Sequence, residues 1–479
     1  MEDKYKLFKR LICYSFIILT CVIVPLYVEN AYFNITKAKF NAYRFGIVIL
    51  LLALIFIMAF DKQKIKFEPN KLEKLLISFG LLSLLSSLLA YHFDQAFFGS
   101  NGWYIGTFTI MTAIVFCIFI SRNKFNYKFF WGVILGINII IFIFSILHSA
   151  KIDVFNLHLG INKKQYFSYI STVGNVNWMV GYLCLIIPML FCRYLKLEDK
   201  RQYLYLFVLF LGVFNIILVN SDGIFLGFGI MAFFLVPYIF KNVRYLNKSA
   251  YIIVLLVFVG LILKLPIFDA KYLEISGLTK IIISNIALIG LSLIALVIIY
   301  LCHKNLINDK ALKITRNIIL IILGLFVIYF IYDMVKAFVT YNYYWGNNRA
   351  LIWNESFKIY KDYFSLKQKI FGVGPEYLNE WYYYLSENLK ARVLVSHSEP
   401  IQLLLTGGIV GIINYVLIVV MVIKSYFKNN LEDNYQLPFL MSIIAYLGQS
   451  LVNSMTPLNV GLLALVFAMY MKNEKEVLK

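Results

Sequence analysis

The chain has 479 residues, of which 61% are hydrophobic and only 15% are charged. Soluble domains are about half apolar and about a quarter charged. Because the surface of a protein grows steeply with its size, one water-soluble core cannot hide this apolar excess. The composition excludes a soluble enzyme and indicates a protein whose main solvent is lipid.

The net charge of +20 is spread along the chain rather than gathered in one segment. Lys and Arg fall in the short stretches between apolar runs, whereas a nucleic-acid-binding protein needs a clustered basic face. We therefore expect a lipid bilayer and no nucleic acid as a partner. The six cysteines lie in or beside apolar runs without metal-ligand spacing, so they are interpreted as small hydrophobic residues.

Fourteen apolar runs follow one another, and a helix of about 20 such residues crosses a bilayer. The sequence predicts an all-α, polytopic transmembrane helix bundle of about 12–14 spans. No cleavage site follows the basic start, so the first run is interpreted as a retained helix. The runs cover residues 11–28, 45–60, 75–91, 105–121, 129–148, 176–193, 203–219, 223–240, 251–268, 279–301, 317–335, 400–423, 437–453 and 458–471.

The positive residues of the short connections predict the orientation of the bundle. Most of them lie on the cytoplasmic side if the N-terminus is cytoplasmic. An even number of spans then places the C-terminal tail on the same side. We divide the chain into an N-terminal bundle of about 11 spans (1–335), an extracytoplasmic loop (336–398), and C-terminal helices with a cytoplasmic tail (399–479).

The long loop at 336–398 is rich in aromatic residues. We expect Asn347 to cap a first amphipathic helix, the stretch 371–375 to end it, and a second helix to cover about 376–394. These helices lie on the membrane surface or form a lid whose rings stack on a sugar, and the two alternatives are compatible. The residues expected on their shared faces are Arg349, Trp353, Phe357 and Tyr360, then Tyr377, Trp381 and Tyr384.

The stretch Ser396-His397-Ser398-Glu399, where this loop re-enters the bilayer, is the most informative for chemistry. An ionisable residue at such a place is costly and is a candidate site residue, although His397 alone could be an interfacial histidine. The chain has no Walker loop, dinucleotide fingerprint, HExxH motif or paired-cysteine site, so we expect no cofactor and no metal.

The order of several short motifs resembles the O-antigen ligase and O-antigen polymerase superfamily of bacterial lipid-linked glycan transferases. In that family an arginine opens the long outer loop, a Gly-x-Gly follows, and a His-Asn/Ser element precedes a Gly-rich helix. A Gly-Asn-Pro-Asn element occurs earlier in the chain. The matching residues are Gly174-Asn175-Val176-Asn177, Arg349, Trp353, Phe371-Gly372-Val373-Gly374, His397-Ser398-Glu399, Gln402 and Gly408-Ile409-Val410-Gly411.

This resemblance implies a membrane glycosyltransferase that acts on the outer face of the cytoplasmic membrane. The donor would be a glycan on undecaprenyl pyrophosphate, and the acceptor a glycan or an envelope polymer. Ligase and polymerase activity are not separated by these motifs. The expected catalytic residues are His397 as base, Arg349 for the pyrophosphate and Glu399; the expected substrate-binding residues are Trp353, Asn175, Asn177, Gln402 and Trp381.

Structural alternatives stay open for these motifs. Asn175 and Asn177 could be helix caps, Gly372 and Gly374 plain turn glycines, and Gly408 and Gly411 sites of close helix packing. The chain also departs from the family pattern, because Asp222 stands where many members have an arginine. Lys264 and Arg392 are candidates for the replacing cation. A polytopic transporter or flippase of lipid-linked sugars is the alternative function, and a non-catalytic scaffold a third.

Overall fold

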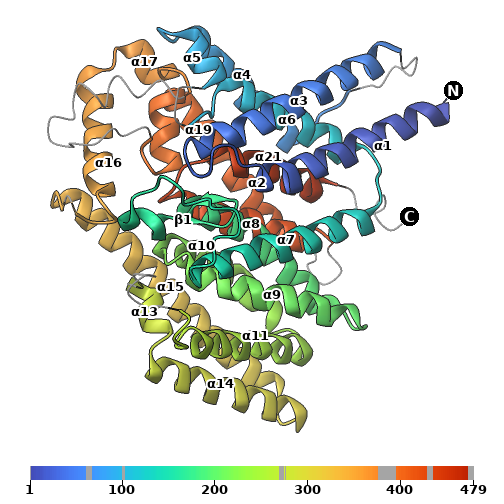
Figure 1. Ribbon diagram of the computed structural model, residues 1–479, viewed down its shortest axis with the longest axis vertical. Helices are drawn as coiled ribbons and strands as arrows, with labels where there is room; N and C mark the ends of the chain where they lie inside the picture. Colours follow the sequence, from blue (N-terminus) through green and yellow to red (C-terminus); the bar gives the residue numbers. More distant parts are fainter. Residues whose placement is uncertain are drawn as a thin grey trace.

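The computed structural model describes residues 2–60, 67–99, 103–268, 275, 277–342, 344–375, 395–428 and 435–472. In these residues the chain is almost entirely helical (Figure 1). Its strands form one two-stranded antiparallel ribbon of β1 (Tyr169–Ile170) and β2 (Gly174–Asn175). The predicted all-α fold is confirmed.

Each of the fourteen apolar runs coincides with a helix. Four of these helices are too short or too charged to count as spans: α4 (Lys71–Leu88), α6 (Thr107–Arg122), α20 (Leu437–Ser450) and α21 (Pro457–Met471). Ten helices of the described residues are long and apolar enough to cross a membrane: α1 (Glu2–Ile18) with the turns continuing it to Leu26, α3 (Ile35–Phe60), α7 (Tyr127–Ser149), α8 (Val176–Lys196), α9 (Arg201–Leu218), α10 (Asp222–Ile239), α11 (Val243–Ile262), α14 (Asn285–His303), α15 (Asp309–Val339) and α19 (Glu399–Lys428).

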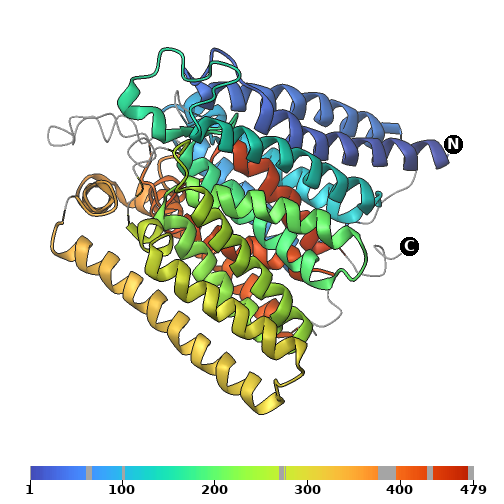
Figure 2. The same ribbon diagram turned by 60° about the horizontal axis from the view of Figure 1, so that its bottom comes forward.

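The many-span prediction is therefore confirmed, with ten helices of full span length where the sequence predicts 12–14. The difference comes from the centre of the bundle. α20 and α21 have 14 and 15 residues, which at 1.5 Å per residue is shorter than a hydrocarbon core of about 30 Å. Because other helices surround them, these two need not match the thickness of the bilayer. By contrast α15, with 31 residues and no buried residue in its apolar window, runs along the outside (Figure 2).

The bundle is built around α8, whose apolar window is 89% buried. α8 packs against α9, α20 and α21, and α20 also packs against α10. Small residues permit these approaches: a Cβ on Gly181 would lie 2.4 Å from the amide of Asn459, and one on Gly227 would lie 2.6 Å from the carbonyl oxygen of Ala445. Without a hydrophobic driving force between helices in lipid, such close backbone packing supplies much of their association.

The helices run between two distinct ends of the bundle. The start of α1 lies at the same end as the close of α21 (Figures 1 and 2). There Lys472 donates to the carbonyl of Asn123 and its ammonium lies 4.4 Å from the ring centre of Phe125. The β-ribbon, α16 (Arg349–Lys358) and α17 (Leu366–Phe371) lie at the opposite end, which we call the α16 end.

The segment predicted as a long loop differs from the prediction in three respects. α15 continues to Val339, so the loop begins later than residue 336. Asn348, in a left-handed conformation and without a side-chain capping bond, precedes α16, so the predicted cap by Asn347 is wrong. The helix ends at Tyr363, before the predicted break at 371–375, and α17 intervenes. The second predicted helix, 376–394, lies outside the described residues.

Candidate functional site

The predicted site residues of the described chain gather at the α16 end, although they come from distant parts of the sequence. Asn175 caps α8, Asp222 begins α10, Arg349 begins α16, and His397 lies two residues before the start of α19. The helices alternate in direction, so the connections that carry these residues all emerge at one end of the bundle. This arrangement is what allows residues more than 200 positions apart to share a site.

The Arg349 guanidinium is held by two hydrogen bonds and keeps donors in reserve. Its Nη1 donates to the carbonyl of Gly346 and its Nη2 to Oδ1 of Asn453, each at 3.0 Å. Its Nε is buried and has no partner among the described residues. Burial lowers the pKa of Arg349 to about 10, and the carboxylate of Asp222 opposes this shift. The side chain therefore stays positively charged at neutral pH.

The charge of Arg349 reaches His397, whose ring is neutral. Its backbone is left-handed, with φ of 52°, a conformation that costs energy for a residue with a Cβ and often marks functional positions. The imidazole meets the Trp103 ring edge-on, with centres 6.2 Å apart. Burial, and after it the charge of Arg349, lowers the pKa of His397 to about 4. The ring can therefore accept a proton at neutral pH.

Glu399 and Gln402, in the first turn of α19, hold backbone segments in place. Oε2 of Glu399 accepts a hydrogen bond of 2.8 Å from the Met455 N–H, so this carboxylate binds backbone rather than the His397 ring. Oε1 of Gln402 accepts one of 2.9 Å from the Ser396 N–H. Gln402 thus fixes the residue before His397, and Glu399 ties the start of α19 to Met455; any contact of either side chain with substrate stays a prediction.

Trp353, predicted to bind substrate, is buried and serves as an anchor. Only 3% of it is exposed, and its indole N–H donates to the carbonyl of Ser396 at 3.0 Å. Its ring lies 5.5 Å from that of Trp345, whose N–H binds Asp333. The observed function of Trp353 is therefore to tie α16 to the residue before His397. Trp381, the other predicted stacking residue, lies outside the described residues.

Asn175 and Asn177 connect the start of α8 to the neighbouring helices. Oδ1 of Asn175 accepts a hydrogen bond of 2.8 Å from the Asn177 N–H, which is the capping alternative considered for this motif. Oδ1 of Asn177 accepts one from the hydroxyl of Ser221, just before α10, at 3.4 Å. The Gly-Asn-Val-Asn motif therefore positions the α8 and α10 ends, and its contact with substrate stays a prediction.

The glycines of the two Gly-rich motifs meet each other. Gly372 has φ of 79°, and a Cβ there would lie 2.1 Å from the carbonyl oxygen of Thr406. Gly408 interrupts α19 with φ of 64°, and its Cβ would lie 2.3 Å from the Ile370 carbonyl. The Val373 N–H also binds the Leu405 carbonyl at 3.1 Å. The close approach is therefore between the C-terminal end of α17, in the outer loop, and a kink in α19, so at Gly408 the close-packing alternative is the one observed.

Asp222 brings a negative charge to the place where the resembled family has an arginine. Its carboxylate accepts a hydrogen bond from the Leu278 N–H and interacts electrostatically with Arg349. Lys264, a candidate for the replacing cation, binds the side chain of Asn285. Arg392, the other candidate, lies outside the described residues. Of these three candidate cations, Arg349 is the one that contacts other site residues in the described part of the chain, through its hydrogen bond to Asn453.

Sequence reasoning missed the connection between α20 and α21, which joins these residues. Asn453 binds Arg349, Met455 binds Glu399 through its N–H, and the Met455 carbonyl accepts a hydrogen bond from the indole of Trp103. One short segment, Asn453 to Met455, therefore contacts Arg349, Glu399 and Trp103. The polar residues that interrupt the apolar run of 437–471 could have revealed it: Gln449, Ser450, Asn453, Ser454 and Thr456.

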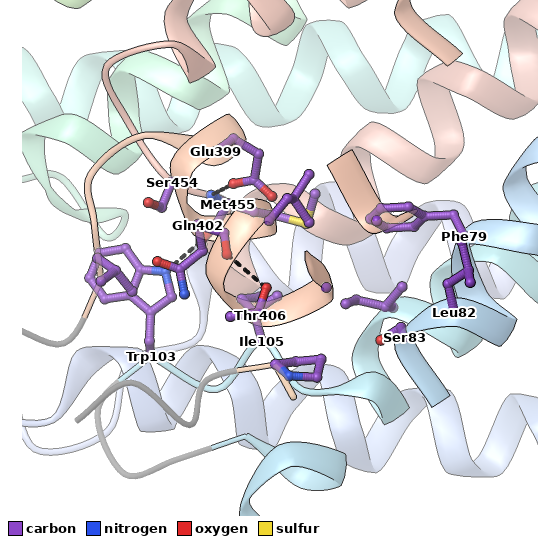
Figure 3. A pocket seen from close by; sticks show the side chains of 16 residues that line it. Phe79, Leu82, Ser83, Trp103, Ile105, Glu399, Gln402, Thr406, Ser454 and Met455 are labelled. Carbon is purple, nitrogen blue, oxygen red and sulfur yellow. Dashed lines mark hydrogen bonds between the residues drawn. The ribbon is translucent and has the colours of Figure 1, made fainter. Parts of the chain in front are cut away.

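A small cavity of about 50 Å³ lies beside this segment (Figure 3). Its polar lining comes from Ser83, Trp103, Glu399, Gln402, Thr406 and Ser454, and its apolar wall includes residues of α4, α6 and α19. A buried water needs about 10–15 Å³ of such space. The cavity therefore has room for a few water-sized groups.

Another cluster, missed by sequence reasoning, brings three possible metal ligands within 4.8 Å: His148, Asp153 and His158. The Ser171 N–H donates to His148 Nδ1, so the proton of that neutral ring lies on Nε2, which faces Asp153 at 3.3 Å. His158 Nδ1 faces the same carboxylate at 3.0 Å. A metal on His148 Nε2 would force a proton onto Nδ1, against the Ser171 N–H. The cluster thus fits a carboxylate that clamps two protonated nitrogens better than a metal centre.

Comparison with known proteins adds no family. No protein-family model matches the chain, and no curated protein is significantly similar to it. The chain is a multi-pass membrane protein made of apolar helices, with polar and ionisable side chains assembled at the α16 end.

Proposed function

We propose that the chain is a membrane glycosyltransferase that moves a glycan from undecaprenyl pyrophosphate to a sugar hydroxyl, as an O-antigen ligase or polymerase does. The observation that carries this proposal is the neighbourhood of Arg349 and His397. A buried guanidinium with an unused N–H and a neutral imidazole lie within electrostatic reach at one end of a membrane bundle. These are the groups that displacement of an anionic leaving group by a hydroxyl requires.

Arg349 binds the leaving group in this mechanism. The donor's pyrophosphate lies at the level of the lipid headgroups, where the α16 end meets the membrane surface. A guanidinium has five N–H donors in a planar fork. Arg349 forms one hydrogen bond from Nη1 to Gly346 and one from Nη2 to Asn453. The remaining donors are available for phosphate oxygens, and their charge stabilises the negative charge that builds up as the bond breaks.

His397 is the general base. The acceptor oxygen forms a bond to the anomeric carbon of the donor glycan, and the bond from that carbon to the phosphate oxygen breaks. The electron pair leaves with undecaprenyl pyrophosphate, and the acceptor's proton passes to the imidazole, which later releases it to water. The sugar–phosphate bond drives the reaction, so the chemistry needs no nucleotide.

This function implies an orientation. The lipid-linked donor is presented on the outer leaflet, so the α16 end faces outward and both termini are cytoplasmic. The distribution of Lys and Arg supports this orientation. A transporter of lipid-linked sugars needs a polar site near the membrane midplane. The contacts among Arg349, Asn453, Met455 and Glu399 at one end support the enzyme instead.

The test is transfer by the purified full-length protein in lipid nanodiscs, supplied with a lipid-linked oligosaccharide. We expect longer or transferred glycan from the wild type, and at least a 100-fold loss in His397→Ala and Arg349→Ala. His303→Ala, at an exposed residue, and Arg316→Ala, at a half-buried residue, both lie outside the site and are matched controls. Full transfer by His397→Ala at wild-type protein levels would remove His397 from the mechanism. A ladder of products indicates polymerisation, and a single transfer indicates ligation.

A further inference from the structure

The cavity beside the α20–α21 connection is lined by polar groups whose hydrogen-bonding capacity the described residues do not fill. The Ser454 hydroxyl is buried, with 8% of the residue exposed, and has no hydrogen-bond partner in the described part of the chain. Within the same described residues, Glu399 uses one carboxylate oxygen for Met455, and Gln402 uses only its carbonyl oxygen. An unsatisfied buried polar group costs about 1–3 kcal/mol. These atoms are therefore poised for a ligand.

The position of this cavity relative to His397 is informative. The charge of Arg349 reaches the imidazole. Trp103 meets the imidazole edge-on and also lines the cavity (Figure 3). A general base must lie beside the hydroxyl whose proton it accepts. Because one indole contacts both the imidazole and the cavity, the cavity is the place for the acceptor.

The lining also defines the charge of the ligand. Among the described residues that line the cavity there is no Lys or Arg, and Glu399 is the ionisable acid. A carboxylate or phosphate would find no counterion among these lining residues, whereas hydroxyl groups can bind Ser454, Glu399 and Gln402 together. The small volume suits a hydroxymethyl group or two ring hydroxyls, and an indole beside it suits the apolar face of a pyranose.

We propose that this cavity is the subsite for an uncharged sugar of the acceptor, with Ser454, Glu399 and Gln402 binding its hydroxyl groups. The proposal rests on the proposed function, because that function makes the acceptor a carbohydrate. It goes further in naming the residues that select the acceptor and in excluding acidic sugars such as uronic acids at this position.

Ser454 gives the sharpest test. If its hydroxyl binds the sugar, Ser454→Ala weakens sugar binding without lowering the heat stability of the protein; if its hydroxyl is structural, the substitution lowers heat stability and leaves sugar binding unchanged. Ser454→Ala removes a buried hydroxyl without a partner, so the folded protein is expected to be as heat-stable as the wild type or more so. The same change removes one hydrogen bond to the sugar, so affinity for the sugar is expected to fall about three- to ten-fold. Ser249→Ala is the matched control, because the Ser249 hydroxyl binds the Tyr245 carbonyl of its own helix.

The binding experiment uses methyl glucoside and glucuronate as probes, with saturation-transfer NMR on the full-length protein in nanodiscs. We expect the wild type to bind the glucoside at least ten-fold more tightly than the glucuronate, and only Ser454→Ala to weaken the glucoside. Equal binding of the two sugars, or unchanged binding in Ser454→Ala, would overturn the subsite. The sugar comparison needs no variant, so it decides the matter even if Ser454→Ala fails to fold.

A parallel transfer assay separates this proposal from the function on which it rests. Sugar binding that depends on Ser454 without any glycan transfer would support the subsite and contradict the glycosyltransferase. Transfer with an unchanged acceptor KM in Ser454→Ala would support the enzyme and overturn the subsite. An acceptor KM raised three- to ten-fold, with an unchanged donor KM, would support both.

Discussion

Arg349 and Asn453 lie 104 positions apart in the chain, and Nη2 of the guanidinium donates a hydrogen bond of 3.0 Å to the Asn453 amide oxygen. The amide nitrogen of Asn453 donates in turn to Oε1 of Gln449 in α20, also at 3.0 Å. A guanidinium on a short loop helix is thus oriented by the end of a central helix. The direction of the unused Arg349 donors therefore depends on α20 and not only on α16.

Asn453→Leu is expected to lower glycan transfer about ten-fold or more and to raise the donor KM. Leucine has a similar volume but no acceptor for the guanidinium, and a hydrogen bond to a charged group contributes about 1.5–3 kcal/mol. Steady-state kinetics with lipid-linked donor provides the measurement. Asn317→Leu, which changes an exposed asparagine of α15, is the control. Unchanged kcat and donor KM in Asn453→Leu would show that Arg349 is oriented by other contacts.

The acid limb of the pH profile is expected to move when the charge at Arg349 is removed. The base must be neutral, and a pKa of about 4 keeps His397 neutral down to about that pH. Removing the cation raises the pKa of His397 toward its ordinary value of 6.5, so protonation abolishes activity at a higher pH. Arg349→Met should therefore shift the acid limb of kcat/KM upward, although its residual activity is low.

Arg349→Lys serves as the control for this profile. It keeps the positive charge, so the acid limb should stay where it is in the wild type. Its activity should still fall, because an ammonium lacks the planar fork of donors. The same acid limb in the Met and Lys variants would mean that the charge at position 349 does not reach His397.

The helices and the location of the site could be predicted from sequence, because both depend on local patterns. Runs of apolar residues specify helices in lipid, and the alternation of loops fixes which connections share an end. Arg349 and His397 were identified by resemblance to motifs. Asn453 and Trp103 were not, because their function arises from contacts across the bundle that no local spacing encodes. For Asn453, the one indication in the sequence is that polar residues interrupt the apolar run of 437–471.

The errors at the loop have local physical causes. An asparagine normally caps a helix from an extended conformation, but Asn347 and Asn348 both have positive φ, so neither side chain reaches the helix N–H groups. Gly408 packs closely against the end of α17, as its motif predicts, but its backbone conformation also kinks α19, which the motif does not predict. The spacing of apolar residues along the chain does not specify the sign of φ at a given residue. It could therefore predict neither the missing asparagine cap nor the kink at Gly408.

The packing of α10 against α20 gives a prediction about stability. Gly227→Ala would place a methyl group 2.6 Å from the Ala445 carbonyl oxygen, so the two backbones must separate. Overpacking of this kind costs about 1–3 kcal/mol, and the apparent Tm in detergent should fall. Gly290→Ala is the control: its added methyl meets nothing within 4 Å, so helix propensity should leave the Tm unchanged or raise it. Equal Tm values for the two variants would contradict the close α10–α20 contact.

Asp153 should stabilise the outer loop as a hydrogen-bond acceptor. Its carboxylate accepts hydrogen bonds from the N–H groups of Leu157 and His158, at 2.9 and 2.8 Å, and it faces the rings of His148 and His158. Burial alone would raise the pKa of Asp153, but these hydrogen bonds outweigh burial and lower it. A lowered carboxyl pKa contributes stability above the ordinary value of 3.8, and that contribution is lost as the pH falls below it.

Asp153→Asn should therefore lower the apparent Tm at pH 7, because its amide group presents a donor to one of the two imidazole N–H groups. A loss of about 1–3 kcal/mol is expected. Asp199→Asn is the control, since Asp199 forms an exposed pair with Arg201 that contributes little. The difference between the two variants should persist at pH 4 and shrink only as the pH falls below 3.8 through the lowered pKa of Asp153, where the wild-type carboxylate is itself protonated. A chelator should leave the wild-type Tm unchanged; a lower Tm after chelation would show that a metal, rather than the Asp153 hydrogen bonds, holds this loop.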